Sequence, residues 1–524
     1  MNAELSHQRE QQATRDLSFL KNVFVISGST ALSRVLGLVR DVVIAHLFGA
    51  SRAYDAYLIA FMIPHLLRRL LAEGALSSAF IPIFTERLAK DGPERAARFA
   101  NIVVTAALIF FPGLVLLGVL FAPVYVPFFA DGFSAEQLEL TIRLTQITFP
   151  FIALVGIAAI FMGVLNSYEK FFAPAFAPVL FNVGVIFSAF GLLSLFTEPI
   201  YALAVGVLLG GLGQLLFQVP YLRERWRYRP QLDLRDRDLH KLVKLMLPSV
   251  VGLAIFQINS IVDNKLASHL AEGSISALQY AVRLFQLPLG LFVVSVGSVL
   301  LPKLAAHAAE RDTEVFTQTL RKSTQFSLFI LLPATAGLFA LAKPIVQLLF
   351  EHGSFTPEDT ALTVYALINY LPGLIGYGLA YLLTRAFYAL QETRTPLIVG
   401  AVTVFLNVVL DYALVGPFGV GGLALATSLA GMANALLLLF ALQRRLSHNV
   451  WMTCIAGAGT VKMLGASVLM GVTVYVLAAW ASPLGEFFTV SLGVAVGASV
   501  YVGLAWLGGF LPSQQLSAKT RTKA

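Results

Sequence analysis

Residues 99–122 read FANIVVTAALIFFPGLVLLGVLFA, a stretch that contains no charged side chain. A helix rises about 1.5 Å per residue, so this stretch is long enough to cross a hydrocarbon core of roughly 30 Å. It therefore predicts a transmembrane helix. Apolar runs of similar length recur along the whole chain, which indicates a polytopic membrane protein.

The composition of the 524 residues supports the same conclusion. Hydrophobic residues make up 57% and charged residues 13%, against roughly 25% charged residues in a soluble domain, which argues against a soluble enzyme. The net charge of +8 comes from basic residues in short loops, and these form no continuous surface for nucleic acid. A lone cysteine, Cys454, can form neither an internal disulfide nor a thiolate metal site.

The apolar runs predict an all-α fold with fourteen transmembrane helices. A polar N-terminal tail, residues 1–18, precedes the first run, which is too long and too interrupted by charge for a cleavable signal peptide. The expected spans lie near 19–47, 56–84, 99–122, 141–166, 174–195, 200–221, 245–268, 275–302, 323–342, 361–390, 396–414, 421–442, 459–480 and 488–511.

The distribution of Lys and Arg tests this count, because these residues accumulate in cytoplasmic loops. With the amino terminus inside, the segments on the cytoplasmic side carry 27 basic residues. The loops on the opposite side carry two, Arg52 and Lys343. One span more or fewer would destroy this asymmetry, so we expect fourteen spans with both termini in the cytoplasm.

An offset of 222 residues aligns Pro150 with Pro372 and Gly156 with Gly378, and it also aligns Pro174 with Pro396; Pro82 and Pro302 pair at 220. Coincidence is the alternative in a chain with 23 Pro and 41 Gly. A duplication predicts two pseudo-symmetric six-helix halves, an arrangement typical of transporters that alternate between inward-open and outward-open states. The expected parts are the tail 1–18, a lobe 19–222, a basic linker 223–244, a lobe 245–445, two further helices within 446–511 and a tail 512–524.

Eight basic residues remain inside the expected spans, where an arginine costs roughly 2.5–3.5 kcal/mol on insertion scales. They are Arg34, Arg40, Arg68, Arg69, Arg143, Lys265, Arg283 and Arg385. Snorkelling from a helix end explains Arg143, Lys265 and Arg385, and it explains Arg69 as well as a cavity does.

The other arginines favour a cationic cavity. Arg34 shares a helical stripe with Asp41, so a structural ion pair is an alternative there, whereas Arg283 has no acidic residue within four positions. Guanidinium groups favour phosphate, because their planar fork donates two parallel hydrogen bonds. Asp41, Asp55 and Glu73 fit salt-bridge partners better than a general acid, and phosphate-loop and hydrolase motifs are missing. We therefore expect an anion-binding transporter, not an enzyme.

A second set of polar residues lies in the later spans. Asn407 and Asp411 are four residues apart and share one helix face, and Ser260 and Asp263, with Thr427 and Ser428, form further polar pairs. These oxygens suit a hard cation, and hydrogen bonds between helices explain them equally well. No resident cofactor is expected. If a cation binds, sodium or a proton as a coupling ion is favoured over calcium.

Two stretches resemble a known family: SRVLGLVRDVVIAHLFGA (33–50) and DAYLIAFMIPHLLRRLLAEGALSSAFIP (55–82). ITFPFI (147–152) and LNSYEKFFAPAFAP (165–178) extend the likeness. The sequence is similar to the MurJ (MviN) family of bacterial lipid II flippases, within the multidrug/oligosaccharidyl-lipid/polysaccharide exporter superfamily.

The resemblance implies transport of lipid II, an undecaprenyl-pyrophosphate disaccharide-pentapeptide, from the inner to the outer leaflet by alternating access, with no bond made or broken. Cell-wall synthesis proteins would be partners, besides membrane lipids. It implies that the last two helices form a groove for the prenyl tail. Family cavity residues match Arg34, Arg40, Asp55, Arg68 and Arg283, with Asp41, Arg69 and Glu73 in support. A sodium site known in some members matches Asp263, Asn407, Asp411 and Thr427.

Three departures affect the pairing of charges in the cavity. Some relatives have Lys at Met62, Asn at His65 and an acid at Val282. The alternatives are an ion-coupled exporter of another polyprenyl-linked saccharide or of drugs, a membrane enzyme acting on lipid-linked sugars, and a scaffold. A cationic cavity disfavours cationic drugs, the expected outer loops are short for such an enzyme, and a scaffold gives no reason for arginines within the bilayer.

Overall fold

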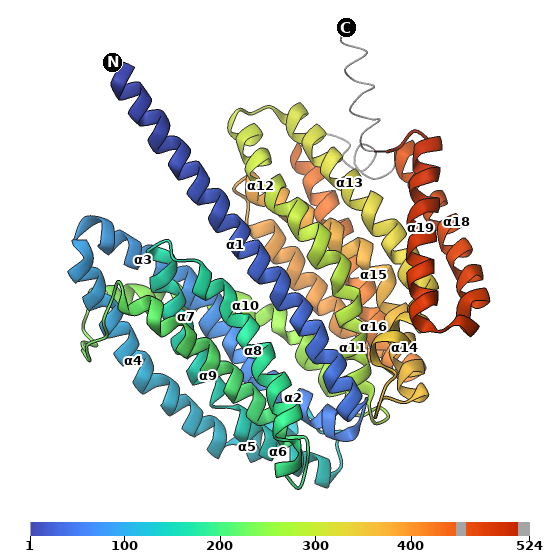
Figure 1. Ribbon diagram of the computed structural model, residues 1–524, viewed down its shortest axis with the longest axis horizontal. Coiled ribbons are helices and arrows are strands. Elements are labelled where there is room, and N and C mark those ends of the chain that lie inside the picture. Colours follow the sequence, from blue (N-terminus) through green and yellow to red (C-terminus); the bar gives the residue numbers. More distant parts are fainter. Residues whose placement is uncertain (1, 447–456, 512–524) are drawn as a thin grey trace. The chain divides into compact units, whose positions relative to one another are not determined.

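The computed structural model describes residues 2–446 and 457–511, with side chains from Val25 onward except at positions 72, 73, 75, 77 and 458. Every regular element in these ranges is a helix, which confirms the all-α prediction (Figure 1). The expected tail 512–524 lies outside the described residues. The described chain forms two compact units, one up to Gln257 and one from Ile258 onward.

The first unit begins with a long helix, α1 (Asn2–Phe48), which includes the polar tail expected at 1–18. Glu, Gln, Ala, Leu and Arg dominate this tail, and all have high helix propensity. The remaining elements are α2 (Arg52–Leu67), η1 (Arg68–Leu76), α3 (Ser77–Lys90), α4 (Gly92–Leu120), α5 (Ala122–Phe129), α6 (Ala135–Thr148), α7 (Phe151–Ser167), α8 (Phe172–Gly191), η2 (Leu193–Leu195), α9 (Tyr201–Arg223) and most of α10 (Arg237–Ala267).

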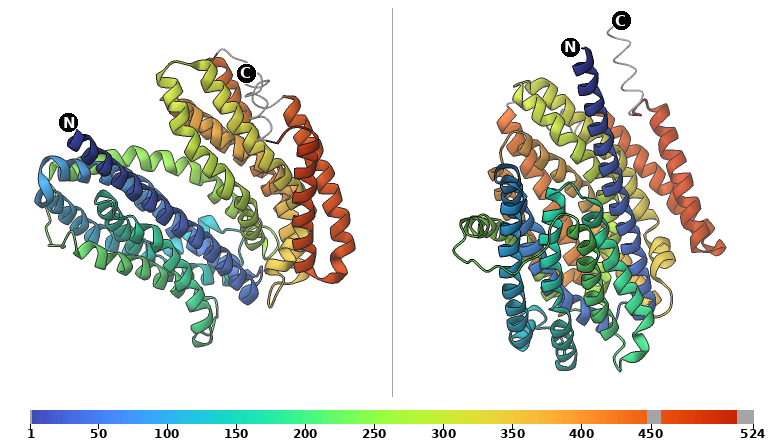
Figure 2. Two further views of the ribbon diagram at one scale, coloured as in Figure 1. Left: turned by 45° about the horizontal axis from the view of Figure 1, so that its top comes forward. Right: turned by 60° about the vertical axis from the view of Figure 1, so that its left-hand side comes forward.

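The second unit starts within α10. Its elements are α11 (Ser274–Pro288), η3 (Leu289–Val293), α12 (Val294–Ala309), α13 (Thr313–Ala340), α14 (Ala342–Phe350), α15 (Pro357–Ala389), α16 (Arg394–Leu446), α18 (Ala458–Ala481), η4 (Ser482–Leu484) and α19 (Glu486–Leu507). Helices α18 and α19 pack on each other, α18 also packs against α13, and α19 packs against α14 (Figure 2).

Eleven helices of the described chain are long and apolar enough to cross a membrane, which is compatible with the fourteen expected spans. The expected spans 396–414 and 421–442 fall in α16, whose helix is broken at Gly419, with φ 52° and ψ −129°, so that two helices meet there and the two spans stay separate. Glycine suits this position because it lacks the Cβ that penalises a positive φ. A Cβ on Gly422 would lie 2.2 Å from the backbone oxygen of Leu414, so the chain folds back at this break. The expected span 19–47 lies within α1, and 56–84 runs over α2, η1 and α3.

Wider π-helical turns interrupt one long helical segment in each unit. In the first unit η1 separates α2 from α3, and in the second η3 separates α11 from α12. Each π segment lies between two prolines, Pro64 and Pro82 in one case and Pro288 and Pro302 in the other. Such segments are rare and occur frequently at functional sites.

Glycines allow close helix packing in both units. A Cβ on Gly184 of α8 would lie 2.5 Å from the backbone N of Gly210 in α9, so the two backbones nearly touch. Gly156 and Gly378, which the offset of 222 residues aligns, pack alike: a Cβ there would meet a side chain of α4 at 2.2 Å and one of α13 at 2.3 Å, respectively. Each glycine therefore faces a long helix of its own unit.

Candidate functional site: arginines of α1 and α2 and a polar cluster on α10 and α16

Arg40 binds to protein groups on two helices. Its Nε and Nη2 donate to Asp41 Oδ1, at 3.0 and 2.6 Å, and its Nη1 donates to Asn182 Oδ1 of α8 at 3.0 Å. Its guanidinium carbon lies 5.8 Å from the ring centre of Phe181. Asn182 Nδ2 in turn donates to the backbone oxygen of Ser33 at 3.0 Å. These contacts tie α1 to α8, which pack along each other (Figure 1), and they offset the cost of a largely buried guanidinium.

The remaining arginines of α1 and α2 have different environments. Arg34 is exposed in the first unit, although it lies well inside the expected first span. Arg68 is half-buried where α2 gives way to η1, and Arg69 beside it is exposed. Asp55 is buried in the first turn of α2, where the positive end of the helix dipole favours a carboxylate. The side chain of Glu73 lies outside the described side chains.

A row of aromatic rings follows one face of α2 toward Arg68. Tyr54, Tyr57, Phe61 and His65 stack in sequence, with ring centres 5.9, 6.0 and 5.4 Å apart. Arg68 Nη2 lies 3.3 Å from His65 Nε2. The row holds His65 in place, and His65 orients the Arg68 guanidinium.

Arg283 belongs to the second unit. It lies in α11, six residues before η3, and its side chain is half-buried. In each unit an arginine of the expected cavity therefore lies at or close to a π segment, Arg68 at the start of η1 and Arg283 before η3.

The polar cluster predicted for the later spans lies within the second unit. Asn407 and Asp411 of α16 are fully buried, and Asn407 Nδ2 donates to Asp411 Oδ1 at 3.4 Å. The carboxyl group of Asp263 on α10 lies within hydrogen-bonding reach of the Asp411 carboxyl group. Two carboxylates this close repel each other, so a shared proton or a bound cation must lie between them when the pair is stable.

Four buried oxygens of this cluster accept no hydrogen bond from the described residues: Asp263 Oδ1, Asn407 Oδ1, Asp411 Oδ2 and Thr427 Oγ1. Buried polar atoms of native proteins are normally hydrogen-bonded. Carboxylate, amide and hydroxyl oxygens are ligands for hard cations, so these residues fit a sodium ion or a proton. Ser428 differs from Thr427, because its hydroxyl donates to backbone oxygens of Asn369 and Tyr370, at 2.7 and 2.8 Å, and ties α16 to α15.

Within the described ranges, no group of three or more His, Cys, Asp or Glu side chains is arranged to hold a metal ion. The cluster on α10 and α16 contributes two acids. Any cation there must also use neutral oxygens, which suits a monovalent ion better than a strongly bound divalent one.

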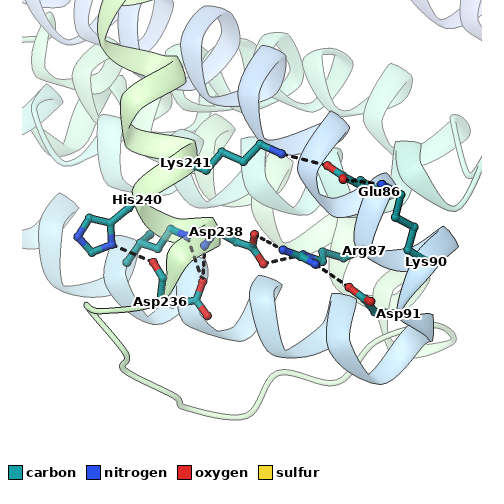
Figure 3. A network of polar contacts seen from close by, with 9 residues as sticks. Glu86, Arg87, Lys90, Asp91, Asp236, Asp238, His240 and Lys241 are labelled. Carbon is teal, nitrogen blue, oxygen red and sulfur yellow. Dashed lines mark hydrogen bonds and ion pairs between the residues drawn. The ribbon is translucent and has the colours of Figure 1, made fainter.

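A network of ion pairs joins the end of α3 to the start of α10 (Figure 3). Arg87 Nε and Nη2 donate to the two carboxylate oxygens of Asp238, both at 2.7 Å, and Arg87 Nη1 donates to Asp91 at 2.7 Å. Glu86 accepts from Lys90 and from Lys241, both at 3.0 Å. The hydrogen bonds from Arg87 to Asp238 and Asp91 raise the pKa of Arg87 above its ordinary value.

Three features were not predicted from the sequence: the row of rings on α2, Asn182 and this network. The ring positions 54, 57, 61 and 65 share one face of a helix, so their spacing would have revealed the row. Asn182 stands alone among apolar residues, which was a second signal. The pairing of Arg87 with Asp238 joins residues 151 positions apart, and no local pattern predicts such a contact.

Together the all-helical fold, the membrane-spanning helices, the arginines of α1 and α2 and the acidic pair define a polytopic membrane protein with the features of a transporter. A family model described as "Lipid II flippase MurJ" matches residues 44–494. The "Probable lipid II flippase MurJ" of Vibrio cholerae is 35% identical over 514 residues, covering 95% of each chain. The chain belongs to the MurJ lipid II flippase family.

Solved structures agree with this assignment. A structure of a lipid II flippase MurJ in an inward closed conformation matches with a TM-score of 0.78 at 31% identity, covering 92% of this chain and 98% of that chain. An inward-facing multidrug resistance MATE family transporter of the MOP superfamily matches with a TM-score of 0.70 at 16% identity, covering 79% of this chain and 94% of that one. The second likeness shows a shared fold only.

Proposed function

We propose that this protein moves lipid II from the inner to the outer leaflet of the cytoplasmic membrane. The observation that carries the proposal is membership of the MurJ family together with arginines placed inside expected membrane spans. Transport of this kind makes and breaks no covalent bond, so the protein needs binding and release but no catalytic residue. The precursor would supply peptidoglycan synthesis, and proteins of cell-wall synthesis are the expected partners.

In this proposal the pyrophosphate of lipid II is held by Arg34, Arg40, Arg68 and Arg283, with Asp55 setting their charge balance. Arg34 is the strongest candidate for direct contact, because its side chain is exposed within its unit. Arg40 positions α1 against α8 through Asp41 and Asn182. Asp41, Arg69 and Glu73 support the site from neighbouring positions. Guanidinium groups match phosphate oxygens with paired hydrogen bonds, which selects for an anion.

We also propose that Asp263, Asn407, Asp411 and Thr427 hold a coupling ion, either sodium or a proton. A bound sodium ion or proton offsets one of the two negative charges, which relieves the repulsion between the carboxyl groups, and it contacts oxygens that otherwise accept no hydrogen bond from the described residues. Binding that differs between two conformations shifts their populations by the difference in affinity. An ion gradient would then drive net movement of the anionic lipid.

The proposed topology places both termini in the cytoplasm, two six-helix lobes at 19–222 and 245–445, and a basic linker at 223–244. Helices α18 and α19, within 446–511, would form the groove for the prenyl tail. They carry many exposed apolar side chains, among them Val468, Tyr475 and Trp506, which suits contact with lipid chains.

The test is the leaflet distribution of lipid II in cells depleted of this protein. An externally added enzyme that cleaves lipid II reaches only the outer leaflet. We expect uncleaved precursor to accumulate, wild-type protein to restore cleavage, and Arg34→Ala to fail although it inserts normally. Arg143→Ala is the matched control, because Arg143 is exposed and pairs with Glu139 one turn away; it should restore cleavage fully. Full cleavage in depleted cells that have no other flippase would overturn the proposal.

A further inference from the structure

A pocket of about 510 Å³ lies in the first unit where α9 ends. Its apolar lining comes from Phe161 of α7 and from Val219 and Leu222 of α9. Helix α9 is a candidate membrane span that ends at Arg223. The pocket therefore lies at the level where the chain leaves the membrane.

Two arginines complete one part of this lining. Arg223 and Arg227 both border the pocket, and both are exposed. Neither forms an ion pair with another described residue, whereas Arg87 and Lys241 of the network between α3 and α10 are paired. The pocket thus combines an apolar wall with two guanidinium groups that have no acidic partner in the described chain. Guanidinium groups of this kind bind phosphate oxygens.

Two aromatic side chains border the same pocket. Trp226 is 5% exposed, and its ring centre lies 6.0 Å from that of Phe161 and 6.2 Å from that of Tyr228. The Trp226 Nε1–H is buried and has no acceptor among the described residues. A buried donor without an acceptor is costly, and an oxygen bound at this wall would supply one. Trp and Tyr are also the side chains enriched at membrane interfaces.

The segment that carries these residues is fixed to α4, although it is not helical. Thr105 Oγ1 lies 3.0 Å from the Tyr228 hydroxyl and accepts from Gln231 N at 3.0 Å. The Arg229 N donates to Asn101 Oδ1 at 3.0 Å. These bonds hold the wall of the pocket in place before any ligand binds, which lowers the entropic cost of binding.

We propose that this pocket binds the head group of an anionic phospholipid of the surrounding membrane. Arg223 and Arg227 would contact the phosphate, and the apolar wall would receive the first part of an acyl chain. A free phosphate ion could use the arginines but would gain nothing from Phe161, Val219 and Leu222, so the lining favours a lipid. This lipid is a resident ligand and not the transported substrate, so the inference goes beyond the proposed function and does not depend on it.

The experiment uses the full-length protein in phosphatidylcholine nanodiscs, with Trp226 as the probe. Replacing Trp451, Trp480 and Trp506 by Phe leaves Trp226 as the single tryptophan. Brominated acyl chains quench tryptophan fluorescence at close range. We expect brominated phosphatidylglycerol to quench Trp226 more strongly than brominated phosphatidylcholine, with an apparent preference of about tenfold or more.

Matched double variants locate the effect. Arg223→Ala/Arg227→Ala should abolish the preference for phosphatidylglycerol. Arg225→Ala/Arg229→Ala removes the same charge from positions that do not line the pocket, and it should retain most of this preference. Equal quenching by the two lipids would overturn the proposal. Equal loss in both double variants would also overturn it, because it would indicate diffuse attraction of a basic segment. Suppression of the preference by millimolar inorganic phosphate, at constant ionic strength, would assign the site to free phosphate instead.

Discussion

Arg34 and Arg40 lie six positions apart on α1, and their surroundings differ in a way that assigns them separate roles. Arg40 donates three hydrogen bonds to Asp41 and Asn182. Its removal would leave the Asp41 carboxylate buried without these bonds, so loss of stability is expected before loss of binding. Arg34 is exposed, and its removal should affect the ligand more than the fold.

The first residue-scale prediction concerns the acidic pair. Asp411→Asn keeps the shape of the side chain but removes one negative charge from the proposed cation site. We expect sodium binding, measured by calorimetry with sodium against choline chloride, to weaken by about tenfold or more, because a paired buried charge is lost. Ser260→Ala is the control, since Ser260 lies on the α10 stripe but is exposed. Unchanged sodium binding in Asp411→Asn would contradict the site.

A second prediction concerns pH. Hydrogen bonds from Lys90 and Lys241, with their charges, lower the pKa of Glu86 to about 2, below the usual value of about 4.3. A lowered pKa means that Glu86 stabilises the folded state above the unfolded-state pKa, and that this contribution is lost as pH falls toward 2. The difference in melting temperature between wild type and Glu86→Gln should be constant from pH 8 to about 5 and disappear by about pH 2.

The control for this pH prediction lies on the same helix as one of the partners. Lys241→Gln removes a hydrogen bond that lowers the pKa of Glu86. In this variant the stabilisation by Glu86 should therefore be lost at a higher pH than in wild type. Lys244→Gln removes the same charge from a lysine that forms no ion pair with a described residue, and the pH profile should stay as in wild type. An identical profile in both lysine variants would show that the network does not control Glu86.

The sequence identifies candidate residues well when the signal lies in their own stretch of chain. An arginine within an apolar run, or an acid four positions from an amide, is visible without a structure, and Arg34, Asn407 and Asp411 were identified this way. Partners distant in sequence were not identified. The pairing of Arg40 with Asn182 depends on how α1 packs against α8. The helical stripe suggested Arg34 as the partner of Asp41, whereas the structure also pairs Asp41 with its neighbour Arg40.

Helix α10 starts against α3 and continues into the second unit, so the ion pair of Arg87 with Asp238 anchors its beginning. The Asp238 side chain is 10% exposed and that of Arg87 is 31% exposed, which favours a stronger pair than one in open solvent. We expect Arg87→Asp to destabilise the protein by about 1–2 kcal/mol, measured as a lower melting temperature in detergent.

The exchanged pair Arg87→Asp/Asp238→Arg is the decisive variant for this element. It restores opposite charges across α3 and α10 and should recover part of the lost stability. Arg98→Asp, whose partner Asp233 lies at 3.5 Å with both side chains more exposed, should have a smaller effect than Arg87→Asp. A double variant that is less stable than the two single changes combined would contradict a direct pair.

Most expected spans lie largely within a helix of the structure, because apolar length is a direct signal of a membrane helix, whereas polar extensions of a helix beyond the apolar run carry no such signal. The break at Gly419 lies between the expected spans 396–414 and 421–442, as predicted. Interruptions within a single expected span were harder to predict. A π segment is defined by which backbone carbonyl each amide contacts. The spacing of apolar side chains, from which helices are predicted, therefore does not reveal it.

At the scale of the whole molecule, the proposed orientation places both termini in the cytoplasm. Cys454 is the only cysteine and lies in a stretch that the basic residues assign to the cytoplasm. A membrane-impermeant maleimide should label it only after the membrane of intact cells is permeabilised. In a Cys454→Ser background, Glu198→Cys lies in the expected outer loop between α8 and α9 and should react in intact cells. Reversed accessibility would invert the topology.

The two π segments also bear on the proposed duplication of the chain. Pro64 and Pro82 lie eighteen positions apart and Pro288 and Pro302 lie fourteen positions apart, a difference of four. The π segment η1, with nine residues, is longer than η3, with five, by the same four. Four extra residues in an α-helix would rotate everything after them by about 400°, roughly 40° past a full turn. Four residues are thus close to one full turn, so a difference of four residues changes little which side of the following helix meets its neighbours. Under the proposed duplication, the two halves differ in the length of this segment while the faces that pack against neighbouring helices stay nearly aligned.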